Sequence, residues 1–315
     1  KSQFGFLFPE KLWEDSYYSK LKSIYVRTTK NDIGLKPFRI KYIDVEMSAE
    51  HRELYQKIKN VRRREFESMS DQITLRKLKQ CIMHLLQISS NPRIIDDEYF
   101  LNTVENLGLE KLITSSSNKF NAVCDLVNKI TSKGEKVLIW SSFKKNINLL
   151  ELELSHLNPV KIDGSVDTGE VGEIGTRKDN IYRFKNDETC KVFIANPAAA
   201  SEGISLHIDS NGNKVCSNAI YLDRNFNSSQ FLQSVDRIHR IGAIGVPNIY
   251  IFRTKESIDM RVQERLNEKI NNMLELLDDN SLRPYIKTEN FYPDPNSQEE
   301  IAKEEAEFYY SYLNE

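Results

Sequence analysis

The sequence contains no uninterrupted apolar run approaching the roughly 18 residues that a membrane-spanning helix needs. Its opening segment, KSQFGFLFPEKLW, has neither the apolar core nor the small-residue cleavage pattern of a secretory signal peptide. We therefore expect an intracellular protein, which is cytoplasmic if the source is prokaryotic. Methionine is absent from the first position, where the chain begins with Lys1, and we interpret the sequence as a segment of a larger protein.

Cysteine is scarce, and the few cysteines present do not suggest a metal site. The sequence has 4 of them, Cys81, Cys124, Cys190 and Cys216. They lie far apart, form no CxxC pair and have no histidine at the spacing of a metal ligand. The pattern favours buried free thiols over a zinc site, and we predict no metal ligands in this chain.

The sequence also has little net charge, because 44 lysines and arginines stand against 46 aspartates and glutamates. This balance gives no overall attraction to nucleic acid, so contact with phosphates would have to come from local clusters. One cluster of cations lies between Lys57 and Lys79 and includes Arg62, Arg63 and Arg64. These side chains are expected either to face nucleic acid or to form a solvated helix surface.

A phosphate-cradling loop of the form GxxxxGKS/T is missing as well. The nearest approach runs from Gly164 to Gly169, but Glu170 occupies the position of the lysine. No acidic metal-binding box of the Asp-Glu type follows a suitable strand. The chain thus lacks the parts that hold Mg²⁺ and the β- and γ-phosphates of ATP, and we expect no ATP hydrolysis by this chain alone.

What the sequence does contain is an alternation of short apolar runs with amphipathic ones beyond Gly134, which is typical of a parallel sheet covered by helices. Strands are expected at residues 136–142, 160–163, 191–197, 219–223 and 248–254. A long helix is expected from about Ile258. A helical pattern also covers residues 48–95 and stops at Asn91-Pro92. We predict an α/β fold with helices on both faces of a parallel sheet, preceded by a mostly helical segment.

The helix expected after residues 219–223 carries the most specific pattern. Gln233, Arg237 and Arg240 are spaced i, i+4 and i+7 and would share one face of that helix. Such a face would lie near the carboxyl end of the preceding strand, where a guanidinium group suits a polyphosphate. Arginines on a helix are more commonly solvated, so the pattern is weak by itself.

Two further segments follow expected strands. The small residues of NPAAASEGISLH, at 196–207, would let the backbone approach a phosphate closely and offer N–H donors, or would only allow tight packing of a helix on the sheet. After the apolar strand residues KVLIW, at 136–140, Ser141, Ser142, Lys144 and Lys145 could hold phosphate oxygens.

Together these segments resemble the C-terminal half of the Swi/Snf-type family of superfamily-two DNA translocases, in order over about Lys22 to Lys269. The matching segments are VRTTKNDI, VEMSAEHRELYQKI, LKQCIMHLLQISSNPRII, SSSNKFNAVCDLVNKITSKGEKVLIWSSFKKNINLLE, KIDGS, RKDNIYRFKND, ANPAAASEGISL, QSVDRIHRIG and ESIDMRVQERLNEK. The resemblance implies a RecA-like sheet that works with an N-terminal RecA-like lobe on DNA, most readily duplex DNA.

The resemblance also assigns roles. Arg237 and Arg240 would be arginine fingers that stabilise charge on the γ-phosphoryl group of ATP, while the missing first lobe holds Mg²⁺. Further residues of the nucleotide site would be Gln233, Asp236, Glu202 and Gly203, the last two coupling it to DNA. Contacts to nucleic acid would come from Ser141, Ser142, Lys144, Arg177 and Asn196, together with Arg62, Arg63 and Arg64. We expect His239 to support the helix.

The expected domains follow from these assignments. Residues 1–47 would end the first lobe and form a linker, and residues 48–113 would form a helical, protrusion-like segment. Residues 114–281 would form the second RecA-like lobe. The acidic tail, 282–315, is expected to be loose, separately docked or, most simply, a solvated helix.

The sequence departs from the family pattern at several places. Ala243 replaces a glutamine, Ala199, Ala200 and Ser201 replace paired glycines, and Asp223-Arg224-Asn225-Phe226 replaces Asp-Trp-Asn-Pro. Residues 207–217 look inserted, and Asn211-Gly212 predicts a hairpin. We expect a divergent prokaryotic or viral branch acting in DNA restriction, defence or nucleoprotein remodelling. The alternatives are an RNA-acting helicase of the same superfamily and a non-catalytic RecA-like binding or regulatory module.

Overall fold

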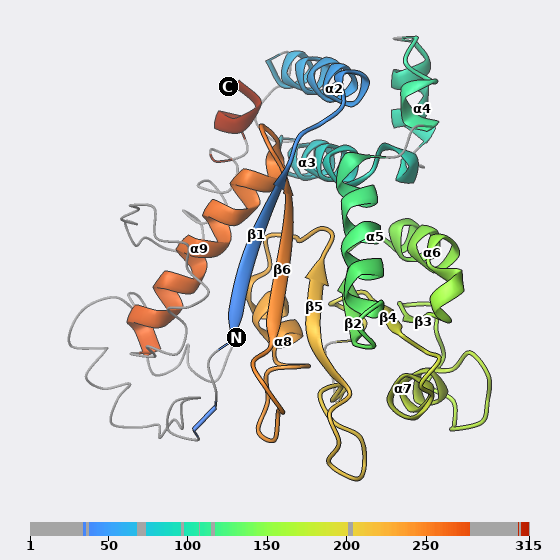
Figure 1. Cartoon of the computed structure of the whole chain (residues 1–315). Coiled ribbons are helices and arrows are strands. Elements are labelled where there is room, and N and C mark those ends of the chain that lie inside the picture. The colour runs from blue at the N-terminus through green and yellow to red at the C-terminus, as the bar shows by residue number, and fades with distance from the viewer. Residues whose placement is uncertain are drawn as a thin grey trace.

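A sheet of six strands forms the centre of the molecule (Figure 1). The computed structural model describes residues 34–35, 38–67, 74–95, 98–106, 108–114, 117–200, 204–277, 308 and 310–314. The strands are β1 (Arg39–Val45), β2 (Lys136–Trp140), β3 (Val160–Ile162), β4 (Val192–Ala195), β5 (Cys216–Tyr221) and β6 (Asn248–Thr254). They lie in the order β1-β6-β5-β2-β4-β3, and every neighbouring pair is parallel. All the strands predicted from the sequence are present.

β1 is the strand that the sequence did not predict. The segment RIKYIDV alternates charged with apolar residues and alternates exposed with partly buried ones, as an edge strand does. It pairs with β6 from Arg39↔Asn248 to Val45↔Thr254. The boundary at residue 47, which placed this segment in the first lobe and a linker, is therefore wrong for residues 39–45.

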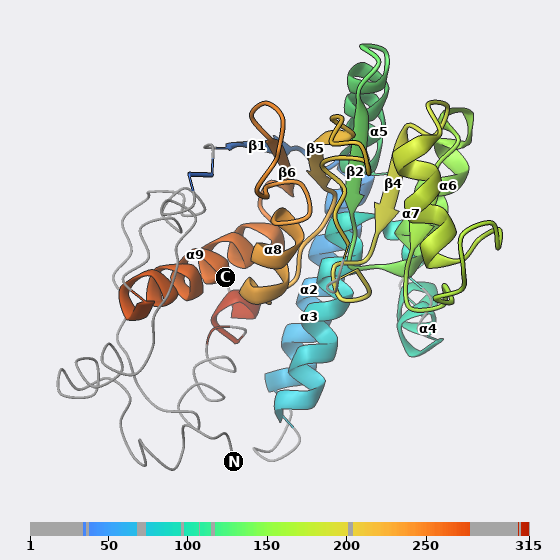
Figure 2. The ribbon, with the colours of Figure 1, turned by 90° about the horizontal axis from the view of Figure 1, so that it is seen from below.

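Helices cover both faces of the sheet, as predicted. They are α5 (Asn118–Thr131), α6 (Lys144–Glu153), α7 (Arg177–Asn186), α8 (Ser228–Val235) and α9 (Ile258–Leu277). Val137 and Ile139 of β2 pack in one core with α5 and α6, whereas Leu138 and Trp140 pack in another with α7, α8 and α9. Figure 2 shows α5 on one side of the sheet and α8 with α9 on the other. This arrangement is the predicted α/β fold.

The preceding helical segment forms a layer across the carboxyl ends of the strands (Figure 1). It comprises α2 (Ala49–Glu67), α3 (Thr74–Ser90), α4 (Glu98–Asn106) and the 3₁₀ turns Pro92–Ile94 and Leu112–Thr114. Its core includes Ile258, Val262 and Leu266 of α9, all buried. The segment is thus packed on the sheet domain through a shared core.

The end of the chain contributes to the same core. Tyr312 and Leu313 are buried, the Tyr312 hydroxyl is hydrogen-bonded to that of Tyr55, and the ring of Phe308 contacts Phe226. The simplest expectation for the tail, a solvated helix, is wrong for residues 310–314. Residues 278–307 lie outside the described part of the chain.

The four cysteines are buried and free, as the sequence predicted. Burial raises the pKa of each thiol, to about 11 for Cys81 and Cys190. Across the described ranges, no helix combines the length and the apolarity needed to cross a membrane.

The predicted hairpin at Asn211-Gly212 is also present. Ile208 and Lys214 form an antiparallel bridge, and the Asp209 carboxylate accepts hydrogen bonds from the N–H groups of Asn211 and Asn213. Gly212 adopts a φ of 82°, a conformation that side chains disfavour.

Candidate functional site

The turn after α8 carries the two arginines that the sequence analysis singled out. α8 ends at Val235, and the chain continues in tight turns, in which the N–H groups of Arg237 and Ile238 bond to the carbonyls three residues earlier. The predicted helical face shared by Gln233, Arg237 and Arg240 is therefore wrong. A spacing of three and four predicts a common face only while the helix lasts.

This turn lies at the amino edge of the sheet. The His239 ring packs on Phe38, just before β1, with 4.8 Å between ring centroids. The chain then reaches Pro247, whose carbonyl accepts a hydrogen bond from the N–H of Arg39 at the start of β1. The prediction of a position near the carboxyl end is wrong, because α8 runs back along the sheet before the turn begins. His239 supports the turn from within the core, and no catalytic role is needed to explain it.

Arg237 is used inside the protein. Its side chain is 9% exposed, and its Nη1 donates to the carbonyl of Ile204 at 3.1 Å. Its own carbonyl accepts from the N–H of Leu206, also at 3.1 Å. Burial, followed by the neighbouring Arg240 cation, lowers the pKa of Arg237. Arg237 thus ties the turn to the segment that follows β4.

Gln233 and Arg240 are exposed, and Asp236 forms the C-cap of α8. Of the residues predicted for the nucleotide site, Gln233 and Arg240 are therefore at the surface, and Asp236 is partly exposed. Glu202 and Gly203 lie outside the described residues, so the structure does not place them against the turn.

His207, which the sequence analysis did not single out, braces the same turn. Its Nε2 lies 3.0 Å from the carbonyl of Ile241, and its Nδ1 lies 3.0 Å from the hydroxyl of Ser205. A carbonyl only accepts, so Nε2 donates to Ile241 and Nδ1 is free to accept from Ser205. Burial lowers the pKa of His207, and the nearby cations Arg240 and Lys185 lower it further.

At the opposite, carboxyl edge, Ser141 and Ser142 follow β2. The Ser141 hydroxyl donates to Asp223 at 2.6 Å, and the Ser142 backbone N–H donates to the same carboxylate at 2.6 Å. The Ser141 side chain is fully buried and presents no surface to a phosphate, so its predicted direct contact does not fit this structure. Lys144, at the first position of α6, is exposed.

Asn196 and Arg177 hold loops at this edge. Asn196 donates to the carbonyl of Ser142 at 3.0 Å and accepts from the N–H of Ala198 at 2.8 Å. Arg177 donates to the carbonyls of Val166 at 2.8 Å and Ala199 at 3.0 Å. Both side chains were predicted to contact nucleic acid. Their hydrogen bonds instead go to the backbone of neighbouring loops.

The three consecutive arginines of α2, Arg62, Arg63 and Arg64, differ in how exposed their side chains are. Arg62 is 1% exposed, forms an ion pair with Glu65 at 2.8 Å and lies 3.2 Å from Nδ1 of His84. Neither a solvated surface nor a contact with DNA fits this residue. Arg63 is partly buried and Arg64 is exposed.

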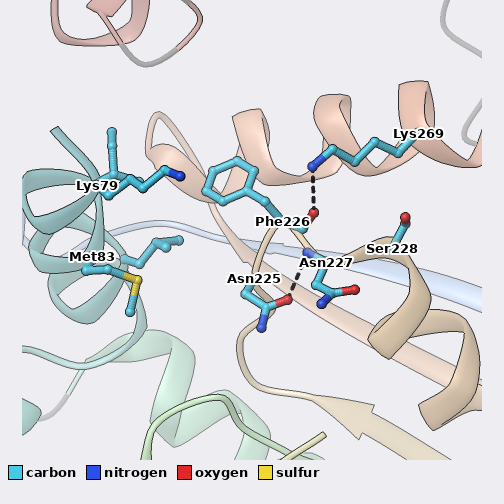
Figure 3. Close-up of a pocket in the computed structure, with 9 residues that line it drawn as sticks. Lys79, Met83, Asn225, Phe226, Asn227, Ser228 and Lys269 are labelled. Atoms are coloured by element: carbon cyan, nitrogen blue, oxygen red, sulfur yellow. Dashed lines mark hydrogen bonds between the residues drawn. The ribbon is translucent and has the colours of Figure 1, made fainter. Parts of the chain in front are cut away.

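A groove of about 540 Å³ opens between α3, the loop after β5 and α9. Figure 3 shows Lys79 and Met83 on one side of it and Lys269 on the other, with the Lys269 ammonium donating to the carbonyl of Phe226 at 3.1 Å. None of the residues predicted for the site lines this groove. Within the described ranges, no cluster of three or more histidine, cysteine or acidic side chains could hold a metal ion.

Sequence reasoning missed Asp223 and His207. Asp223 entered it only as part of a departure from the family pattern, although a carboxylate directly after a buried strand is a signal for a structured polar site. His207 gave no local signal, because its partner Ile241 lies 34 positions away.

Comparison with known proteins identifies this arrangement. The model of the helicase conserved C-terminal domain matches residues 118–242. The ATP-dependent helicase FUN30 of Saccharomyces cerevisiae is 31% identical over 175 residues, 54% of this chain and 14% of that protein. The chromatin-remodeling ATPase INO80 of Homo sapiens is 29% identical over 197 residues, 62% of this chain and 11% of that protein. The chain thus spans only a small part of these relatives.

Two solved structures share the fold. One is the C-terminal part of the Fun30 ATPase domain, with a TM-score of 0.53 and 20% identity, covering 89% of this chain and 99% of that one. The other is the Sulfolobus solfataricus SWI2/SNF2 ATPase core in complex with dsDNA, with a TM-score of 0.56 and 18% identity, covering 88% of this chain and 58% of that one. The predicted RecA-like fold class is confirmed.

Proposed function

Because residues 118–242 match the model of the helicase conserved C-terminal domain, we propose that this chain is the second lobe of a Swi2/Snf2-type, ATP-driven motor that moves along duplex DNA. The first lobe of the same protein would hold ATP with Mg²⁺, and this lobe would complete the cleft. The relatives that carry this domain are named ATP-dependent helicases, and one structural neighbour was solved with double-stranded DNA.

The observation that carries the proposal is the construction of the turn after α8. Arg237 anchors the turn to the carbonyl of Ile204, His207 anchors it to Ile241, and Arg240 remains exposed between them. A fixed backbone presenting one exposed guanidinium suits the stabilisation of charge on a phosphoryl group in transfer. We assign the finger to Arg240, with exposed Gln233 beside the nucleotide, and the support of the turn to Arg237.

The assignment is tested in the intact protein by measuring ATP hydrolysis with duplex DNA, with RNA and without nucleic acid. Duplex DNA is expected to stimulate hydrolysis more than RNA does. Replacing Arg240 with alanine is expected to lower the stimulated rate by about 10³-fold or more while ATP still binds, since an arginine finger typically contributes that much. Lys129→Ala, an exposed cation on α5, serves as the matched control and should hydrolyse ATP normally.

The outcomes separate the alternatives. Stimulation by RNA alone would favour an RNA-acting helicase. An intact protein that neither binds nor hydrolyses ATP would favour a binding or regulatory module. Arg240→Ala turning over at the rate of the Lys129→Ala control would remove the finger assignment. The prokaryotic or viral origin, and a role in restriction, defence or nucleoprotein remodelling, stay predictions.

A further inference from the structure

Asp223 is the centre of a buried polar cluster at the carboxyl edge of the sheet. Its side chain, 3% exposed, lies directly after β5. Four groups donate to it: the hydroxyls of Ser141 at 2.6 Å and Ser90 at 3.0 Å, the backbone N–H of Ser142 at 2.6 Å and the amide of Asn146 at 3.2 Å. One carboxylate therefore joins donors from two stretches that are distant in the sequence, Ser90 and residues 141–146.

The cluster joins the helical segment to the loop after β2. Ser90 is the last residue of α3, and the neighbouring Asn91 donates to the Asn146 amide oxygen at 3.2 Å. Asn146 belongs to α6, which begins at Lys144. The loop 141–143 is thus hydrogen-bonded to Asp223, which follows β5, and Asp223 is in turn hydrogen-bonded to Ser90 of α3. The loop ends at the exposed Lys144.

The donors around Asp223 are all neutral. Burial raises the pKa of this carboxyl, and the hydrogen bonds from Ser141 and Ser142 oppose that rise. A hydroxyl or an amide can turn to another partner, but the backbone N–H of Ser142 can only donate, and Asp223 accepts from it. The path of the loop at Ser142 therefore depends on an acceptor at position 223.

We propose that Asp223 is a positioning residue for DNA binding: it fixes the loop after β2 so that Lys144 is presented to a DNA phosphate. The proposal rests on the proposed function, because it deepens the description of the same DNA-contacting edge. Asp223 itself is buried and touches no DNA. It acts through Ser142 and the first turn of α6.

The protein contains a matched control at the same edge. Asp259 is also buried, 6% exposed, and accepts from Ser89 at 2.9 Å, from the Lys119 ammonium at 2.6 Å and from the N–H of Thr254 at 2.8 Å. It links α3 to β6 and α5, and none of these three hydrogen bonds involves the loop after β2. Loss of either carboxylate removes a buried hydrogen-bond network, with a buried ion pair in addition at Asp259, and of the two networks only that of Asp223 leads to Lys144.

The test measures the affinity of the intact protein for a duplex DNA oligonucleotide over a series of salt concentrations. Lys144→Ala should lower the slope of log affinity against log salt by about 1, as expected for the loss of one phosphate contact. Asp223→Ala, which removes the acceptor for the Ser142 N–H, should lower the slope equally. The double variant should lose no more than either single variant, because both changes remove the same contact. Asp259→Ala should keep the slope of the unsubstituted protein.

Additive losses in the double variant, or an equal slope for Asp223→Ala and Asp259→Ala, would overturn the proposal. Where Asp223→Ala fails to fold, Asp223→Leu, which also lacks an acceptor for the Ser142 N–H but fills the space, carries the same comparison. The proposed function can fail independently. If the protein binds duplex DNA but its ATP hydrolysis does not respond to DNA, the proposed function is wrong, and the salt slopes still decide the role of Asp223. Absence of any binding to duplex DNA overturns both.

Discussion

At the scale of single residues, cations of identical type serve different ends in this fold. Arg62 packs its guanidinium 5.3 Å from the centroid of the Phe100 ring and pairs with Glu65, whereas Arg64, two positions later, is exposed. A buried guanidinium without its hydrogen-bond partners lowers the stability of the fold, and removing the guanidinium leaves those partners unsatisfied. Arg62 is therefore a stability residue of the helical segment.

We predict that Arg62→Ala lowers the free energy of unfolding by about 2–4 kcal/mol, since it removes a buried guanidinium that contacts His84 and Glu65 and leaves a cavity. Arg64→Ala should change it by no more than about 0.5 kcal/mol, as exposed substitutions usually do. Denaturant unfolding followed by circular dichroism measures both. Equal, small effects would contradict the burial of Arg62.

These arginines also show what could be predicted from the sequence at this scale. Arg237 and Arg240 lie within the residues that the family model matches, but their spacing did not distinguish the buried side chain from the exposed one. That difference is set by Ile204, whose carbonyl reaches Arg237 from 33 positions away. Contacts at such separations leave no periodic trace in the sequence.

At the scale of elements, the turn after α8 is held by a histidine whose pKa is lowered in the folded protein. The folded pKa of His207 is lower than its unfolded value because of burial and the cations Arg240 and Lys185. The unfolded chain thus binds a proton at a pH where the folded chain does not. Stability from this residue is present above the unfolded pKa, near 6.5, and is lost as the pH falls through the folded pKa.

We predict that the free energy of unfolding falls less steeply below about pH 6.5 in His207→Gln than in the unsubstituted protein. The glutamine amide can still donate to the carbonyl of Ile241 but does not titrate. Denaturant titrations at several pH values between about 7.5 and 5 give the two slopes. His51, whose pKa burial also lowers, contributes to both proteins and cancels in the comparison. Parallel curves would show that His207 does not titrate differently on folding.

Strands with continuous apolar runs were predictable from the sequence, and β1 was not, for a physical reason. β4 is buried at every residue and its sequence, VFIA, reads as an apolar run. β5 is also buried throughout, but only its part from Ala219 onward is apolar, and that is the part that was predicted. β1 lies at the sheet edge and keeps Arg39, Lys41 and Asp44, which resemble a linker in composition. Its place is set by pairing with β6, and Asp44 anchors it through an ion pair with Arg253 at 2.6 Å.

At the scale of the whole molecule, two cores meet along α9. Ile258, Val262 and Leu266 pack with the helical segment, whereas Ile270 packs with the sheet. The long helix from about Ile258 was predicted correctly, but its sequence does not reveal which elements cover each part of it. The domain boundaries predicted at residues 48 and 113 therefore divide a core that α9 and the C-terminal residues share.

This shared core predicts how fragments behave. A fragment of residues 114–281 would expose Ile258, Val262 and Leu266, each of which contributes about 1.5–3 kcal/mol when buried, and would leave the β6 edge unpaired. We expect it to aggregate or to unfold without cooperativity, whereas residues 38–315 should unfold in one cooperative transition. A fragment of residues 46–315, lacking only β1, should be soluble but less stable. Size-exclusion chromatography and thermal unfolding compare the three. A monomeric 114–281 fragment with a sharp transition would mean that the helical segment is an appendage, as the sequence alone suggested.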